Sequence, residues 1–406
     1  MFAPYKRLFS IPGGLRFSSA AFILRLPISM LYLSIALFIV DEKGSYALAG
    51  TLSMAASLVL AVATPLWSRA ADQYGQNRIL RITAPVHVLF LGIFVYLVKS
   101  DAPTWSWFSA ALIFEAFVIG SGQMVRRRWI HAIGDDRQLV DTAYSYEAFV
   151  DEVIFTSGPV IATLLAAQFA PSISIFVAMF FVSVGTILYL REKATEPPPH
   201  PREEGEDHSL LIRNRTIQAL FIPMMLVGSF FSSAGLVLVG YADSYGIREY
   251  SGFFIAIWSL SSGVAALASG TITWKVNESR RFIFFLTSLF ILTFPILGVV
   301  HFLPGNQIAM GAVLFLNGLA IAPTLTAGFT LAEKAVSEKR TTEVLAWAIS
   351  ALNLGGALPT ALTGYIIDKS GASVAFIVPV GCLFISLLSL LPFLKVWRSQ
   401  LREHQL

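Results

Sequence analysis

Long apolar runs alternate with short polar segments along the whole chain. A helix that crosses the hydrocarbon core of a membrane needs about 20 predominantly apolar residues. Runs of about this length recur twelve times, at roughly residues 17–40, 45–67, 79–98, 105–125, 142–168, 172–191, 216–240, 251–273, 282–302, 307–332, 343–367 and 374–395. Lipid offers no partners for backbone polar groups, and a β-barrel would show short alternating segments instead. The pattern therefore predicts an all-α membrane protein with twelve transmembrane helices.

The composition supports this prediction. The 406 residues are 55% hydrophobic and only 13% charged, whereas soluble proteins carry about 25% charged residues. The net charge of +4 would suit a nucleic-acid partner, but the basic residues lie in the short gaps between apolar runs. Such gaps are rich in Lys and Arg on the cytoplasmic side. We therefore expect membrane lipid as a partner and no nucleic acid.

The same basic residues predict the orientation. With the N-terminus placed inside, the outside loops receive few lysines or arginines: Lys43, Lys99, Arg248 and Lys369. The positive-inside rule then places both termini in the cytoplasm. The predicted location is the cytoplasmic membrane.

One segment divides the chain into halves. Residues 192–209, "EKATEPPPHPREEGEDHS", are proline-rich and acidic and lack an apolar period, which predicts a disordered linker. We therefore expect a six-helix bundle over 1–191, a cytoplasmic linker over 192–215 and a second six-helix bundle over 216–406. A shift of 202 residues places Arg78 on Arg280 and Glu115 on Asn317. This weak symmetry is typical of transporters built from repeats.

The gap after the second run carries a charged turn, "RAADQYGQNR" at 69–78. Together with Ser68, it resembles the loop motif G-x-x-x-D-x-x-G-x-x-R of the major facilitator superfamily, with Ser68 in the first glycine position and Asp72, Gly75 and Arg78 in the others. The stretches "RLPISM", "RRRW", "YSYEAFVDEVIFTSGP" and "GYIIDKSG" add to the resemblance, which extends to efflux-type and actinobacterial permeases. The resemblance implies two pseudo-symmetric bundles around a central cavity.

The loop itself has two interpretations. Gly75 permits a turn in which a Cβ does not fit, and Asp72 can hold helix N-termini or an arginine of the other bundle. Contacts of this kind would form in one conformation and break in the other, so Asp72, Gly75 and Arg78 are candidates for gating. The alternative is a loop that only sets topology, with a capping aspartate.

Charged residues within the runs are functional candidates, because an ionisable group at the membrane centre costs about 2.5–3.5 kcal/mol. Arg25 and Glu115 both lie near mid-membrane. In the resembled family helices 1, 4, 7 and 10 line the cavity, which implies that Arg25 and Glu115 pair across it. The pair is either a structural ion pair or a site for substrate or proton.

The fifth run contains more acids. Glu147 and Asp151 share a helix face, with Glu152 beside them and Arg126 or Arg128 within reach. They form either a neutralising cluster or a proton-carrying acid, for which Asp151 and Glu152 are the candidates. Further cavity candidates come from the second half, where packing or contact with lipid is the alternative role: Phe230, Asn317, Trp347 and Asn353.

Gly158 and Pro159 interrupt the fifth run and are the candidate hinge of that helix, because proline removes a backbone hydrogen bond. They resemble the core of the family's antiporter motif. The motif's following glycine pair is replaced by Ala162 and Thr163, and the family's arginine on helix 4 is missing.

These features predict a secondary active transporter that moves a small, partly apolar compound by alternating access. Proton-coupled efflux is the favoured mode, with the proton gradient as driving force, no cofactor or metal and a monomeric state. A sugar or metabolite exporter, importer or facilitator is the alternative within transporters, and a non-transporting membrane sensor is the alternative outside them. The enzyme motifs HExxH, GxSxG and the P-loop do not occur in the sequence, so we do not expect an enzyme.

Overall fold

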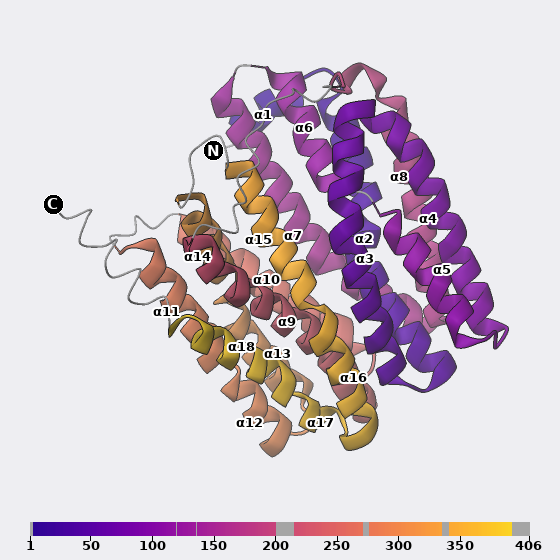
Figure 1. Cartoon of the computed structure of the whole chain (residues 1–406), viewed down its shortest axis with the longest axis vertical. Helices are drawn as coiled ribbons and strands as arrows, with labels where there is room; N and C mark the ends of the chain where they lie inside the picture. The colour runs from indigo at the N-terminus through magenta and orange to yellow at the C-terminus, as the bar shows by residue number, and fades with distance from the viewer. Residues whose placement is uncertain are drawn as a thin grey trace. The chain divides into compact units, whose positions relative to one another are not determined.

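The structure is a computed structural model that describes residues 3–118, 120–134, 136–199, 215–270, 276–334 and 341–391, and the regular elements among them are helices (Figure 1). The first half contains α1 (Ala3–Phe9), α2 (Gly14–Lys43), α3 (Tyr46–Tyr74), α4 (Gln76–Lys99), α5 (Thr104–Ala116), α6 (Ser121–Ile133), α7 (Arg137–Gln168), α8 (Pro171–Arg191) and the 3-10 helix η1 (Lys193–Thr195). The second half contains α9 (Arg215–Ser244), α10 (Tyr250–Gly270), α11 (Glu278–Ile291), α12 (Phe294–Phe302), α13 (Gln307–Gly318), α14 (Ile321–Lys334), α15 (Thr341–Gly355), α16 (Ala357–Ser370), α17 (Ala372–Ala375) and α18 (Ile377–Ser389).

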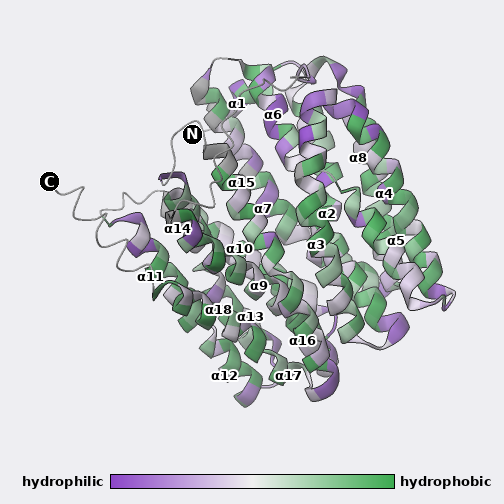
Figure 2. Cartoon of the chain, in the orientation of Figure 1, coloured by the Kyte–Doolittle hydropathy of each residue, from purple (hydrophilic) through white to green (hydrophobic). Residues whose placement is uncertain are grey.

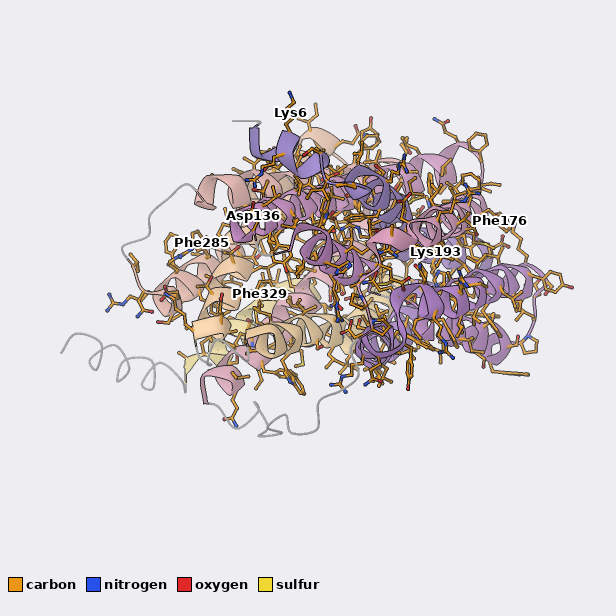
Figure 3. The ribbon with its side chains drawn as sticks, turned by 90° about the horizontal axis from the view of Figure 1, so that it is seen from above. Lys6, Asp136, Phe176, Lys193, Phe285 and Phe329 are labelled. Carbon is orange, nitrogen blue, oxygen red and sulfur yellow. The ribbon has the colours of Figure 1, made fainter. Side chains whose placement is uncertain are left out.

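The helices confirm the predicted all-α membrane fold. Ten helical segments within the described residues are long and apolar enough to cross a membrane. With α10 and the consecutive pair α15 and α16, they account for the twelve predicted spans. Figure 2 shows apolar residues along most of the helices, with hydrophilic residues gathered around α1 and α6. Phe176 of α8 is half exposed and projects outward (Figure 3), as a side chain facing lipid would.

By their contacts the residues form two compact units, Met1–Gly44 with Val59–Glu206 and Ser45–Leu58 with Asp207–Leu406. We call them unit 1 and unit 2. This division differs from the sequence-based one, because the first half of α3 belongs to unit 2 rather than to the bundle over 1–191.

Contacts at the start of α3 explain the difference. The Asp368 carboxylate accepts hydrogen bonds from the backbone N–H groups of Tyr46 and Ala47, both at 2.8 Å, and so caps the helix. A Cβ on Gly50 would lie 2.5 Å from the Thr360 carbonyl oxygen, and one on Gly364 would lie 2.1 Å from that of Tyr46. Glycines on both helices thus let the α3 and α16 backbones touch. This close contact fixes the position of α3 along α16, so that the start of α3 lies beside Asp368.

Unit 1 is built around α2, which packs against α7 and α8. The approach to α8 requires Gly185, since a Cβ there would lie 2.5 Å from the Leu24 nitrogen. The approach to α7 requires Gly158, where a Cβ would lie 1.8 Å from the Ser29 hydroxyl oxygen. Gly158 of the candidate hinge is therefore a packing glycine, whatever Pro159 contributes to bending α7.

The fourth span is broken in two after Ala116, where α5 ends and α6 begins at Ser121. A break in a membrane helix frees backbone groups that need new partners. The Trp67 indole N–H donates to the Ala116 carbonyl at 2.6 Å, and His87 Nδ1 lies 2.9 Å from the Phe114 carbonyl. Side chains from α3 and α4 thus stabilise the break.

The start of the predicted linker is ordered, which corrects the sequence prediction for residues 192–199. Thr195 is buried, and Glu196 Oε1 accepts a hydrogen bond of 2.8 Å from the Asn77 backbone N–H at the start of α4. Residues 192–199 therefore belong to unit 1, because the Glu196 carboxylate pairs with a backbone N–H group that the start of α4 leaves free within the helix. Residues 200–214, the rest of the predicted linker apart from Arg215, lie outside the described residues.

Candidate functional site

Four consecutive side chains on α6, "RRRW" at 126–129, contact different parts of unit 1. Arg126 contacts Asp151 of α7, Arg127 contacts Asp72 of α3, and Trp129 contacts Glu147 of α7. Arg128 binds residues of α4 and α8 and the segment after α8. Consecutive helical residues point about 100° apart, so α6 lies among these elements and connects them.

Arg25 of α2 is the centre of one group of contacts, about 16 Å along the helix from Gly14 at 1.5 Å per residue. Its side chain is 2% exposed. Nη2 lies 2.5 Å from Glu147 Oε2, Nη1 lies 2.8 Å from Asp151 Oδ1, and Nε donates to the Ala21 carbonyl at 3.3 Å. A single buried guanidinium thus binds two carboxylates at once.

Glu147 is fully buried and has no unpaired oxygen. Besides Arg25, it accepts hydrogen bonds at Oε1 from the Trp129 indole N–H at 2.7 Å and from the Ser18 hydroxyl at 3.0 Å. A buried carboxylate is tolerated when charge-assisted hydrogen bonds satisfy it.

Asp151 is the accessible member of the group. Its Oδ2 lies 2.8 Å from Arg126 Nη2. The side chain of Asp151 is 33% exposed and that of Arg126 is 39% exposed. The sequence placed Arg126 within reach of the acids of the fifth run, which forms α7, and the structure shows this contact at Asp151. We call the following side chains the Arg25 cluster: Ser18, Arg25, Arg126, Trp129, Glu147 and Asp151. Two guanidinium groups and two carboxylates make the cluster neutral when all four are ionised.

The predicted pairing of Arg25 with Glu115 is wrong. Among the described residues, the ion pairs of Arg25 go to Glu147 and Asp151. The break in the fourth span explains this, because α6 rather than α5 approaches Arg25: a Cβ on Gly122 would lie 3.8 Å from Arg25 Cδ. Glu115 is partly buried near the end of α5, and Glu152 is partly buried beside Asp151.

The charged turn adopts the predicted glycine conformation. Gly75 has φ of +93°, which side chains rarely adopt. Asp72 forms an ion pair with Arg127 of the same unit, and the Arg78 guanidinium lies 5.9 Å from the centroid of the Tyr74 ring. Ser68, in place of the motif's first glycine, donates to Gln123 Oε1 at 3.0 Å. The turn is thus tied to α6, and its partner is not the helix terminus or other-bundle arginine expected from the sequence.

The Asp72 ion pair permits a clean test of gating. Both side chains are partly exposed, so Asp72→Asn should cost less than about 1 kcal/mol of stability. If the pair holds one state of the transport cycle, Asp72→Asn should slow transport about tenfold while leaving expression and substrate affinity unchanged. Turnover is measured in proteoliposomes beside Asp101→Asn, which removes an exposed acid from its ion pair with Lys43. Wild-type turnover in Asp72→Asn would reject a gating role.

Arg128, which the sequence indicates only as a possible partner of the acids in the fifth run, is fully buried and has other partners. Its guanidinium donates to Gln76 Oε1 at 3.0 Å, Asn77 Oδ1 at 2.9 Å and the Glu192 carbonyl at 2.9 Å, and it stacks 3.7 Å from the Tyr189 ring centroid. The available signal was a run of three arginines in a helix without acids, because residues of such a run must find their partners on other elements.

The candidates of unit 2 have separate surroundings. Asn317 is buried, accepts from the Trp258 indole N–H at 2.8 Å and donates to the Leu289 carbonyl at 3.2 Å. Phe230 packs edge-on against Trp258, with ring centroids 5.4 Å apart. Trp347 and Asn353 are exposed. Asn317 and Phe230 therefore contact the same tryptophan in the interior of unit 2. Asn317 accepts its indole hydrogen bond, and Phe230 packs against its ring.

Ion pairs inside membrane-spanning helices are found in transporters and in other proteins that move ions or protons. The sequence profile of the Major Facilitator Superfamily matches residues 17–310. The chain therefore belongs to this superfamily.

Solved structures share the fold at low sequence identity. A mutant of the nucleoside transporter NupG superposes with a TM-score of 0.77 at 12% identity, covering 94% of this chain and 99% of that one. The POT family transporter PepTSo gives 0.71 at 10% identity, with 97% and 99% covered. A bacterial metal transporter gives 0.64 at 11% identity, with 93% and 97% covered. Among curated proteins no significant sequence match is found. The likeness extends to the fold, and these proteins differ in substrate.

Proposed function

We propose that the protein is a proton-coupled secondary active transporter of the cytoplasmic membrane that exports a small, partly apolar compound. Both termini would lie in the cytoplasm, and the two six-helix bundles would alternate between inward-open and outward-open states. The Major Facilitator Superfamily fold supports transport, whereas direction, driving ion and substrate are parts of the proposal.

The observation that carries the proposal is the Arg25 cluster. Charged groups inside membrane spans are expensive, at about 2.5–3.5 kcal/mol each at the membrane centre on insertion scales, and Arg25 and Glu147 are buried within theirs. Apolar side chains of similar size would often hold the helices together as well or better. Ions in such a position are therefore best explained by a role in the transport cycle.

Asp151 is the best-placed proton carrier among the candidate acids Glu115, Asp151 and Glu152. It bridges Arg25 and Arg126, and one third of its side chain is accessible. Protonation of Asp151 would leave the two arginines with the single carboxylate of Glu147. The charge balance of the cluster, and with it the packing of α2, α6 and α7, would then depend on the proton.

The test is transport in proteoliposomes under an imposed pH gradient, with a panel of acids, bases and neutral compounds. An uncoupler should abolish concentrative transport, and Asp151→Asn should do the same while downhill exchange continues. Glu115→Gln and Glu152→Gln, examined separately, identify any second carrier, and liposomes without protein give the background.

Other outcomes would assign other functions. Accumulation that continues unchanged with the uncoupler would exclude proton coupling, leaving a facilitator or a carrier driven by another ion. Uptake rather than extrusion under the same gradient would favour an importer of sugars or metabolites. Complete absence of flux for every compound, in protein that is folded, would favour a non-transporting sensor.

A further inference from the structure

We infer that Arg25 and Arg126 form a binding site for a small organic monocarboxylate, and that Asp151 occupies this site in the structure. The inference rests on the proposed transport function and names the class of substrate. The carboxylate of the substrate would take the place of the carboxylate of Asp151.

Asp151 shows that a carboxylate fits. Its Oδ1 lies 2.8 Å from Arg25 Nη1 and its Oδ2 lies 2.8 Å from Arg126 Nη2. Each oxygen thus receives one charge-assisted hydrogen bond from a different helix. Guanidinium N–H groups form strong charge-assisted hydrogen bonds with carboxylates, and here two guanidinium groups share one carboxylate.

The site persists when Asp151 moves away. Arg25 keeps its bond of 2.5 Å to Glu147, which Trp129 and Ser18 hold in turn. Arg25 and Glu147 are 2% and 0% exposed, so their packing also restrains them. The binding group nearest the protein interior is therefore preorganised, which lowers the cost of binding.

Charge selects a monoanion. When Asp151 is protonated and moves away, the two guanidinium groups face the single carboxylate of Glu147, which leaves one uncompensated positive charge. One bound carboxylate restores neutrality, as burial in a membrane span favours. Glu152, partly buried beside Asp151, adds negative charge that disfavours a dianion.

Access and apolar surface lie on the same side. Asp151 and Arg126 are about one third exposed, whereas Arg25 is buried behind them. Phe155 lies one turn further along α7 on the face of Asp151 and is 50% exposed, and Ile130 lies one turn beyond Arg126 and is 43% exposed. These apolar side chains suit the hydrocarbon part of an organic acid.

The test uses benzoate as the probe and benzamide as its neutral isostere, titrated calorimetrically into full-length protein in nanodiscs. Asp151→Asn removes the internal competitor and should tighten benzoate binding about tenfold or more, with benzamide unaffected. Arg126→Gln should weaken benzoate binding by a similar factor. Arg7→Gln, which removes an arginine from its surface ion pair with Asp136, should leave it unchanged.

Asp151→Asn leaves the buried Arg25–Glu147 pair intact, so we expect a folded protein. Arg126→Lys provides a second arginine variant, which keeps the charge but loses the guanidinium geometry and should weaken benzoate binding as well. Equal benzoate affinity in wild type and Asp151→Asn, or equal binding of benzoate and benzamide, would overturn the inference. Because binding is measured without a gradient, such a failure would leave proton-coupled transport standing, and a failure of coupling would leave a positive binding result standing.

Discussion

Replacing Arg25 by glutamine should lower the free energy of unfolding by about 3–5 kcal/mol, because it leaves Glu147 buried without its ionic partner. Ser18 and Trp129 would still donate to Glu147, but they carry no charge. The expected result is a large fall in the thermal unfolding temperature of the purified protein in detergent. Glu147→Gln alone should cost less, since Arg25 retains Asp151.

The double variant Arg25→Gln with Glu147→Gln should recover part of the loss, because neither partner then remains as a buried unpaired charge. Transport separates the possible roles. Recovery of both stability and transport would make the pair structural, and recovery of stability alone would make it functional. Arg7→Gln is the matched control at a surface ion pair. Strictly additive losses would show that the two side chains do not act as one unit.

Replacing Arg128 by glutamine should cost about 3 kcal/mol or more, because it breaks a buried hydrogen-bond network that is centred on the guanidinium group. Asn77 Oδ1 would lose the guanidinium donor, whereas Gln76 Oε1 would keep the Tyr189 hydroxyl and the Glu192 carbonyl would keep Thr195 as donors. Arg128→Lys should be nearly as damaging, since an ammonium group lacks the planar fork and the stacking on Tyr189. Thermal unfolding measures the loss of stability. Arg127→Gln, at the adjacent and partly exposed arginine, is the matched control and should cost much less.

A second readout follows from the position of Arg128. Its contacts with Glu192 and Thr195 hold the segment after α8, and Lys193 in that segment is exposed. Loss of the contacts should release the segment and speed tryptic cleavage after Lys193. An unchanged cleavage rate in a destabilised Arg128→Gln protein would show that Arg128 stabilises the helices without holding this segment.

Most of the fold could be predicted from the sequence because insertion into lipid depends on local composition. Each span is a run of apolar residues whose length matches the membrane, and this property does not depend on which helices become neighbours. The turn at Gly75 was also predictable from local sequence, because glycine readily adopts a backbone conformation that other residues rarely adopt. The contact between Asp151 and Arg126 could also be predicted from the sequence, because both residues lie toward the same end of spans that follow each other in the chain.

The sequence alone therefore determined the spans, and it identified Arg25 and Glu147 as charged residues within them. The tertiary structure decided which charges meet. Arg25 binds Glu147 and Asp151 rather than Glu115, because the fourth span breaks after Ala116 and α6 packs beside α2. Likewise, three adjacent arginines that look equivalent in sequence have separate partners, one of them fully buried. Side-chain partners depend on helix rotation and on close backbone approach at glycines such as Gly158 and Gly185, and these are set only when the helices pack.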